Sequence, residues 1–385
     1  MLKTLAIALL TGASALLGPA CVAEPITARN DADVIETLVG GSGERGEERK
    51  MRRALSENPK DVALAARVSE RYLNRARETG DPRFAGLAIA ALQPWRDDLG
   101  APSEVLLLQA TLEQYLHQFD AAADKLERLL MRDPKRAQAW LTLATIRRVQ
   151  GRYDASDVAC RQLLALNAAP YGAACLAEND GLRGRTASAR AAFNHLLATP
   201  RLGTDTRNWL ATSLAELEER AGRVDAAHAA WTAALQARAT PYTVLAYADF
   251  LIFHERHAEA LALLKDQPNN DGVLLRQAIA GVRSGAPGSD VQARAMRERI
   301  SAANLRPGTQ TFHGREQAMF ALWVDKQPQR AFELARANLR QQREPIDLLI
   351  MAQAARALGL EPALREAGRL RQEVGLHDQR IEALL

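Results

Sequence analysis

Apolar residues recur every three or four positions along most of this chain, which predicts a succession of amphipathic helices. From Pro59 onward the helices come in pairs, with a short turn inside each pair. The predicted pairs occupy residues 63–92, 103–136, 137–170, 170–199, 208–239, 241–265, 271–305, 316–339 and 345–372. Residues 375–385 are expected to form a C-terminal capping helix. Prolines at positions 134, 170, 200, 241, 268, 307 and 345 fall between pairs, where they avoid the cost of about 3 kcal/mol that proline has inside a helix.

Two consecutive pairs, Ser103–Arg136 and Ala137–Pro170, superimpose at an offset of 34 residues. The second pair has a large residue, a leucine and a small residue in its first helix, a glycine and an aromatic at the turn, and a small residue after it: Trp140, Leu143, Ala144, Gly151, Tyr153 and Ser156. The first pair has matching residues at Leu106, Ala110, Phe119, Ala122, Leu126 and Pro134.

This pattern resembles the tetratricopeptide repeat, and the resemblance is closest over residues 103–239. It implies an all-α fold, a right-handed solenoid of about eight or nine antiparallel helix pairs over residues 59–374. Small side chains let the two helices of a pair cross closely, so we expect Ala110 to face Ala122 and Ala144 to face Ser156.

The first 23 residues are typical of a secretory signal peptide, with Lys3 before an apolar run from Leu5 to Leu17 and small residues after it. Cleavage after Ala23 is the first interpretation. The alternative is a lipoprotein, with Cys21 as the acylated N-terminus. Residues 24–58 are expected to hold short helices, at 31–39 and 47–56, and a flexible linker at 40–49.

Charge and hydrophobicity exclude some classes of function. The net charge is only +4, and basic residues are spread among acidic ones rather than gathered on one face. Nucleic-acid binding is therefore not expected. No segment after the signal is apolar for long enough to span a bilayer. We expect a protein of the periplasm or one that is secreted, or alternatively a lipoprotein on a membrane.

The resemblance also implies a concave face, formed by the first helices, that binds a protein or peptide partner. By alignment it includes aromatic residues beside polar ones, which suit an extended peptide or a helix: Thr111, Gln114, Tyr115, Gln138, Thr145, Arg148, Tyr171, Glu178, Trp209, Glu216, Tyr242 and Asp249. Members that bind chaperones hold a C-terminal carboxylate with Lys and Asn here. This chain has Leu107 and Leu141 at the lysine positions, and Thr111 and Thr145 at the asparagine positions. That binding mode is not expected.

Two short motifs resemble a dinucleotide-binding motif and a zinc site, but neither has the surrounding residues that such a site needs. The stretch Gly41–Gly46 matches GxGxxG without the strand and βαβ unit that a dinucleotide site needs. His254 and His257 are three residues apart in a predicted turn, without the third ligand of a zinc site. We therefore expect no enzyme activity, no metal and no cofactor.

Cys160 and Cys175 lie at similar depth in two helices that are joined by a turn near Ala168. Helices 8–10 Å apart can bring such residues within reach of a disulfide. The alternative is two unpaired thiols in the core.

The sequence thus predicts an exported tetratricopeptide-type scaffold that binds a partner in the bacterial cell envelope. Two alternatives remain open, an assembly factor for an envelope complex or transporter and an envelope enzyme that grips its substrate with the repeats.

Overall fold

The computed structural model describes residues 42–98, 100–285, 288–305 and 314–385. The chain divides into two units, residues 1–50 and 51–385. The expected signal peptide, Cys21 and the short helix expected at 31–39 lie outside the described residues. The described part of the first unit is the beginning of α1, Ser42–Glu57.

Helix α1 corrects the linker prediction. It begins at Ser42, so most of the segment expected to be flexible is helical. The helical part of this segment contains two glycines, Gly43 and Gly46, but the glutamates and arginines around them are strong helix formers. The helix expected to begin at Glu47 therefore begins five residues earlier.

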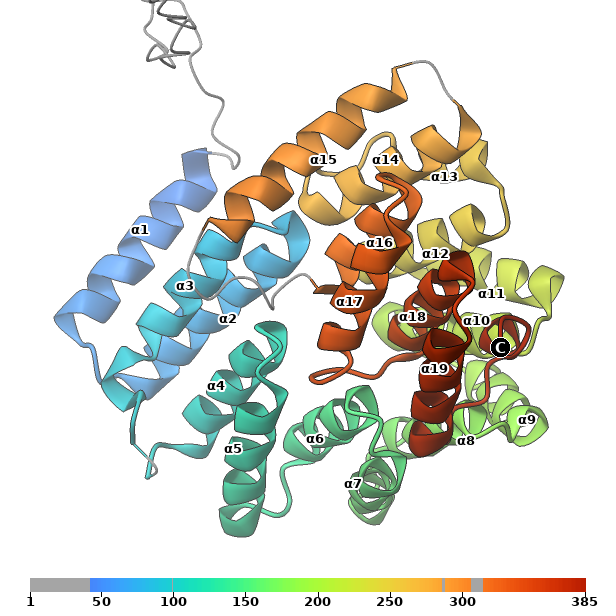
Figure 1. Cartoon of the computed structure of the whole chain (residues 1–385). Helices are drawn as coiled ribbons and strands as arrows, with labels where there is room; N and C mark the ends of the chain where they lie inside the picture. The colour runs from blue at the N-terminus through green and yellow to red at the C-terminus, as the bar shows by residue number, and fades with distance from the viewer. Residues whose placement is uncertain (1–41, 99, 286–287, 306–313) are drawn as a thin grey trace, which may run out of the picture. The chain divides into compact units, whose positions relative to one another are not determined.

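The second unit consists of nine helix pairs, counted over its described residues (Figure 1). They are α2 (Val62–Thr79) with α3 (Pro82–Ala91), α4 (Ser103–Tyr115) with α5 (Phe119–Arg132), α6 (Ala137–Val149) with α7 (Tyr153–Ala165), α8 (Tyr171–Leu182) with α9 (Thr186–Leu197), α10 (Thr204–Arg220) with α11 (Val224–Ala237), α12 (Pro241–Phe253) with α13 (His257–Leu264), α14 (Asp271–Ser284) with α15 (Ser289–Asn304), α16 (Gly314–Trp323) with α17 (Pro328–Asn338), and α18 (Pro345–Leu358) with α19 (Glu361–Val374). A short 3₁₀ helix, Gln93–Trp95, follows α3. The predicted all-α solenoid of helix pairs is confirmed.

The end of the chain differs from the prediction. Instead of a capping helix over residues 375–385, the structure has a single turn, α20 (Gln379–Glu382). Gly375 adopts a left-handed conformation with φ 71° and ends α19. The Asp378 side chain then accepts a hydrogen bond from the Arg380 N–H and begins α20, which leaves little chain for a longer helix.

The predicted small-residue crossings lie at the centre of the pairs. Ala110, Ala122, Ala144 and Ser156 are all fully buried. The Ser156 hydroxyl donates a hydrogen bond of 2.9 Å to the Ala144 carbonyl oxygen, which confirms the expected contact between α6 and α7. A hydroxyl fits this crossing because it takes little space and satisfies its donor locally.

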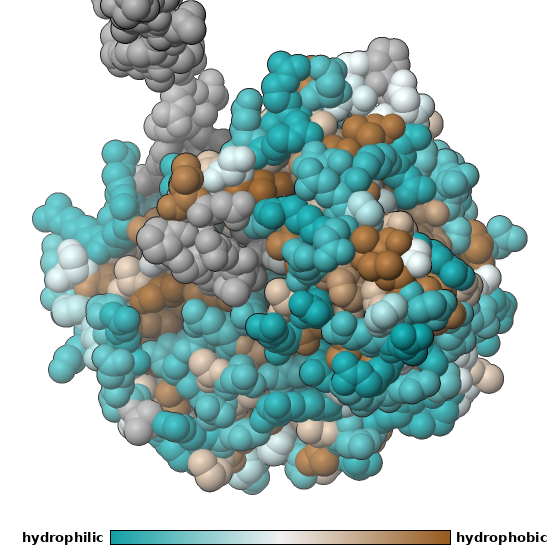
Figure 2. Space-filling model, in the orientation of Figure 1, coloured by the Kyte–Doolittle hydropathy of each residue, from teal (hydrophilic) through white to brown (hydrophobic). Residues whose placement is uncertain are grey.

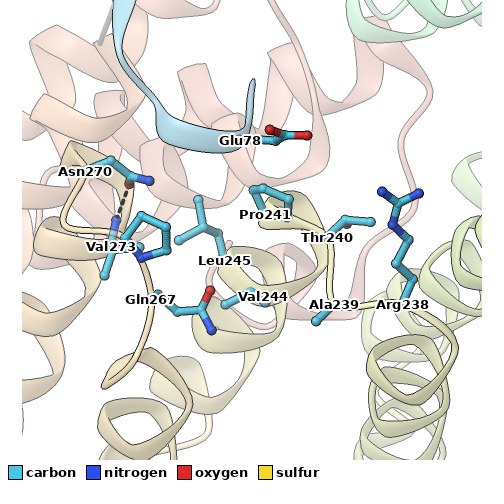
Figure 3. Close-up of a pocket in the computed structure, with 11 residues that line it drawn as sticks. Glu78, Arg238, Ala239, Thr240, Pro241, Val244, Leu245, Gln267, Asn270 and Val273 are labelled. Carbon is cyan, nitrogen blue, oxygen red and sulfur yellow. Dashed lines mark hydrogen bonds between the residues drawn. The ribbon is translucent and has the colours of Figure 1, made fainter. Parts of the chain in front are cut away.

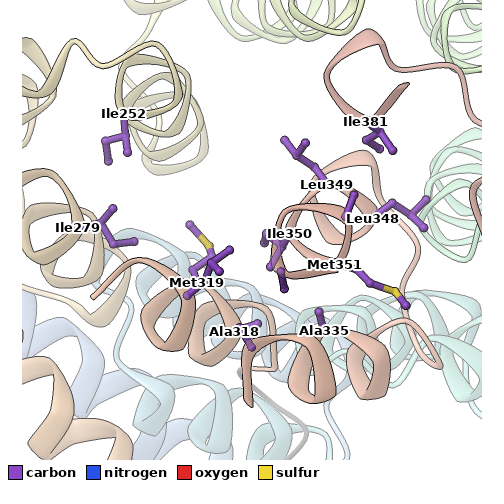
Figure 4. Packing of buried hydrophobic residues seen from close by; sticks show 14 of the residues in the cluster. Ile252, Ile279, Ala318, Met319, Ala335, Leu348, Leu349, Ile350, Met351 and Ile381 are labelled. Carbon is purple, nitrogen blue, oxygen red and sulfur yellow. The ribbon is translucent and has the colours of Figure 1, made fainter. Parts of the chain in front are cut away.

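The apolar core is divided into clusters that follow the array. One cluster gathers side chains from α2 to α6, and the largest gathers those from α10 to α20 together with Tyr153 of α7 and Leu182 of α8. Figure 4 shows part of the largest cluster, where Ile252 of α12, Ile279 of α14, Met319 of α16 and Leu349 of α18 converge. On the face shown in Figure 2, hydrophobic residues form small separate areas among hydrophilic ones. Each pair is thus stabilised mainly by its neighbours, as in other solenoids.

The C-terminal pairs also pack against the middle of the array. The Arg343 N–H donates to the Val149 carbonyl oxygen at 2.7 Å, and the His377 N–H donates to the Leu182 carbonyl oxygen at 2.8 Å. These acceptors lie at the ends of α6 and α8, next to the turns inside their pairs (Figure 1). The array therefore curves far enough for its last pairs to contact its third and fourth.

Candidate functional site

The first helices of successive pairs form one continuous face of the second unit, and side chains of the predicted binding face connect them. Four of these connections join α6 to α8, α8 to α10, α10 to α12 and α12 to α14. We call this surface the inner face. The inner face lies inside the curve of the array, because one carboxylate, that of Glu344, is near several of its helices. Glu344 acts electrostatically on four residues that lie on or next to four different first helices: His117, Arg148, Glu216 and Tyr242.

An ion pair and a hydrogen bond link the first three helices of this series. Arg148 of α6 lies 2.5 Å from the Glu178 carboxylate of α8. Glu178 also accepts a hydrogen bond of 2.6 Å from the Ser213 hydroxyl of α10. Arg148 and Glu178, both predicted to contact a partner, therefore bind neighbouring helices of the array.

The aromatic residues of the inner face divide into two kinds. Tyr171 and Trp209 stack on each other with ring centroids 5.6 Å apart, and Tyr115 packs against the first apolar cluster with its hydroxyl 3.4 Å from the Ala76 carbonyl oxygen. These three are half-buried and hold neighbouring pairs together. Tyr242 differs, since it is 59% exposed.

Tyr242 and Glu216 form the most distinctive contact of this face. The Tyr242 hydroxyl donates a hydrogen bond of 2.5 Å to the Glu216 carboxylate. Burial raises the pKa of Glu216 to about 7, although Arg220 and the hydrogen bond from Tyr242 oppose that rise. The Glu216 charge in turn holds the pKa of Tyr242 well above its usual range, so the phenol stays a neutral donor.

The C-terminal pairs place charged residues opposite this contact. Arg315 of α16 pairs with Glu344 and with Asp347, the latter at 2.7 Å. Burial opposes the charge of Glu344, but Arg315 lowers the pKa of this carboxyl. Sequence reasoning missed Arg315 and Glu344 because a single sequence does not show that the array folds back on itself. The capping box formed by Glu344 and Asp347 signals only that a helix starts there.

The remaining predicted site residues are less suited to binding. The hydroxyls of Thr111 and Thr145 donate to carbonyl oxygens in their own helices, Leu107 and Leu141. Gln138 is exposed and lies 3.5 Å from Thr142, while Gln114 is half-buried. Asp249 forms an ion pair of 2.6 Å with Arg276, whose side chain is 8% exposed.

A second concave feature lies where the first pair approaches the sixth and seventh. It is a pocket of about 270 Å³, lined by polar residues such as Glu78, Arg238 and Gln267 and by apolar ones such as Val244 and Leu245 (Figure 3). Its wall comes from the end of α2, from the first turns of α12 and α14, and from the loops before these two helices. Sequence reasoning did not find it, because segments far apart in the chain form it.

The two cysteines are joined in the structure. Cys160 of α7 and Cys175 of α8 form a disulfide with their Cα atoms 5.6 Å apart, in a small buried cluster. Neighbouring helices place them at equal depth, as their spacing from the turn suggests. The bond stays a prediction for the protein in solution, where its redox state can be measured.

The other motifs take ordinary structural places. Residues 42–46 of the GxGxxG match begin α1. His254 ends α12 and His257 begins α13, so both flank a turn, and burial lowers the pKa of each. Among the described residues, no group of three or more His, Cys, Asp or Glu is arranged to hold a metal ion. Over the same residues, no helix has the length and apolar character to cross a membrane.

Known proteins resemble this chain in structure but not in sequence. No protein-family model matches the chain, and no curated protein matches it in sequence. A tetratricopeptide repeat protein from Parabacteroides merdae is similar in structure, with 13% identity and a TM-score of 0.46 over 67% of this chain and 94% of that one. Human IFIT1, solved as a dimer with m7Gppp-AAAA, has 15% identity and a TM-score of 0.39 over 89% of this chain and 87% of that one. A chain of Naa15/Naa10 bound to HypK-THB has 12% identity and a TM-score of 0.30 over 81% and 58%.

The chain is an all-α protein built of tetratricopeptide-like helix pairs. The repeat type follows from its own residues, since the small-residue crossings, the glycine turns and the order of the pairs agree with the pattern in the sequence.

Proposed function

We propose that this protein is a scaffold that binds a protein or peptide partner on the inner face of its repeat array. One observation carries the proposal: an exposed aromatic ring, Tyr242, stands beside the half-buried carboxylate of Glu216 on that face. Aromatic residues next to a polar group are typical of surfaces that bind peptides.

The proposal is for binding rather than catalysis. Most charged side chains of the inner face are occupied with one another, as in Arg148 with Glu178 and Asp249 with Arg276. Such pairs position the helices and leave few groups free for proton transfer.

We also propose that the protein works in the bacterial cell envelope, in the periplasm or tethered to a membrane by a lipid. The supporting features are the signal-like N-terminal residues, including Cys21, and the Cys160–Cys175 geometry, which suits an oxidising compartment. Cell fractionation tests this part, and recovery of the unprocessed chain in the cytoplasm would contradict it.

Affinity capture from envelope extract tests the binding proposal. The informative variant is Glu216→Gln with Tyr242→Ala. Its matched control is Asp154→Asn with Val158→Ala, which removes one exposed acid and one exposed apolar side chain from α7, a second helix. We expect the inner-face variant to lose a partner that both the wild type and the control retain. Equal capture by all three proteins would contradict binding on this face.

A further inference from the structure

The Glu216 carboxylate has an unusual set of neighbours for a charge on the inner face. Other acids near it have an arginine partner: Glu178 has Arg148, Asp249 has Arg276 and Glu344 has Arg315. Within the part of the chain that the structure describes, no lysine, arginine or histidine nitrogen lies within 4.0 Å of Glu216. Its hydrogen-bond partner is the Tyr242 phenol, which carries no charge.

The same hydrogen bond fixes the orientation of Tyr242. Because the hydroxyl is held by Glu216 at 2.5 Å, the ring is anchored at its polar end while 59% of the residue is exposed. A partly buried carboxylate at the hydroxyl end of an anchored, exposed aromatic ring offers two attractions to one positive group, an ion pair with the carboxylate and a cation–π contact with the ring.

From this arrangement we propose that Glu216 and Tyr242 form a subsite for a cationic side chain, lysine or arginine, of the bound partner. The inference rests on the proposed function and names the chemistry that the inner face recognises. This subsite would bind a positive group with an acidic residue, whereas chaperone-binding repeats bind a carboxylate with basic residues.

The surrounding charges are compatible with this subsite. Arg220 lies one helical turn beyond Glu216 and is the main positive charge acting on it, while Glu178 and Glu344 add negative charge. Arg315 faces Tyr242, but its charge is balanced by Glu344 and Asp347. Burial dominates, so the Glu216 carboxylate holds a proton more readily than an ordinary glutamate. A bound cation would stabilise the ionised form in place of that proton.

A library of synthetic peptides tests the proposal. Wild-type protein is screened against immobilised peptides, and the tightest binder that contains lysine or arginine is titrated in solution. The same peptide is then titrated with norleucine or citrulline at the basic position. We expect the neutral peptide to bind about tenfold more weakly.

Variants locate the effect. Glu216→Gln and Tyr242→Ala should remove the preference for the basic peptide, and Asp154→Asn, which loses an acid from α7, should keep it. Arg220→Gln should strengthen binding of the basic peptide, because it removes a repulsive charge, whereas an anion site here would be weakened by the same change. Melting curves show that each variant is folded. Peptide binding without a preference for the basic residue, or a preference that survives Glu216→Gln, would overturn this inference and leave the proposed function standing. If the library contains no binder for the wild type, the subsite inference is overturned, and the affinity capture from envelope extract decides the proposed function separately.

Discussion

The backbone N–H of His377 donates a hydrogen bond of 2.8 Å to the carbonyl oxygen of Leu182. This contact joins the end of the chain to the turn between α8 and α9. Side-chain positions support the same docking. Gly184 and Gly222, at the turns inside the fourth and fifth pairs, lie against His377 and Gln379. The last pairs therefore dock on the turns of the middle pairs, and they set the space in front of the inner face.

Gly184 is a sensitive position in this docking. It has φ 81°, and an added Cβ would lie 2.8 Å from the His377 ring. Gly184→Ala should destabilise the protein through backbone strain and through the clash, by about 1–3 kcal/mol in total. Gly285→Ala is the control, because Gly285 has a similar φ of 65° but open space around it. Denaturant unfolding should show a larger loss for Gly184→Ala, and equal losses would mean that the His377 contact is absent in solution.

Arg380 holds the last turn of the chain by charge. It pairs with Glu219 of α10 and with Asp378 at 2.6 Å, and its side chain is 12% exposed. Arg380→Ala leaves two buried carboxylates without their cation, so we expect a loss of about 3–5 kcal/mol. Arg365→Ala is the control, since Arg365 is 69% exposed and pairs with Glu361 at the surface. Thermal unfolding checks the difference, and similar melting temperatures for both variants would contradict the buried ion pair.

The disulfide prediction concerns Cys160 and Cys175. Because their sequence separation is 15, the bond should stabilise the fold by about 3 kcal/mol in the chain-entropy model. Mass spectrometry of protein exported to the periplasm, after alkylation without reduction, should show neither thiol modified. Two alkylated thiols in the denatured mature chain would exclude the bond.

The pH dependence of stability should carry a signature of Glu216. Its pKa is raised from 4.5 to about 7 by burial, so the native state binds this proton more tightly than the unfolded state. This contribution to stability is full below pH 4.5 and is lost as the pH rises through 7. Glu216→Gln removes the dependence, so the variant should gain stability relative to the wild type between about pH 5 and pH 8. Melting temperatures in matched buffers test this, and a constant difference across the range would contradict the raised pKa.

Local patterns in the sequence predict the pairs well, because each helix is determined by residues near it. Ala144 and Ser156 illustrate this, since the 34-residue repeat in the sequence is enough to place both at the crossing. The docking of residues 340–385 could not be predicted in the same way. It depends on how much each pair rotates relative to the last, and that rotation accumulates from many small contacts.

The candidate site could likewise be predicted only in part. Alignment places Glu216, Tyr242, Arg148 and Glu178 on one face, and the structure brings Glu216 to Tyr242 and Arg148 to Glu178. Alignment does not tell which side chains hold the array together and which face the solvent. Trp209 has a position equivalent to that of Tyr242 in the sequence, and only burial separates the two. Burial depends on contacts with neighbouring pairs, which the repeat pattern does not specify.

Site-specific photo-crosslinking tests the central claim, that the inner face binds the partner, most directly. A benzophenone amino acid replaces Gln138 in one strain and Val158 in another, because both residues are exposed, and Gln138 lies on the first helix α6 whereas Val158 lies on the second helix α7. Irradiation of living cells should join a partner to the protein labelled at position 138 and not to the one labelled at 158. Crosslinks of equal yield at both positions, or at 158 alone, would contradict binding on the inner face.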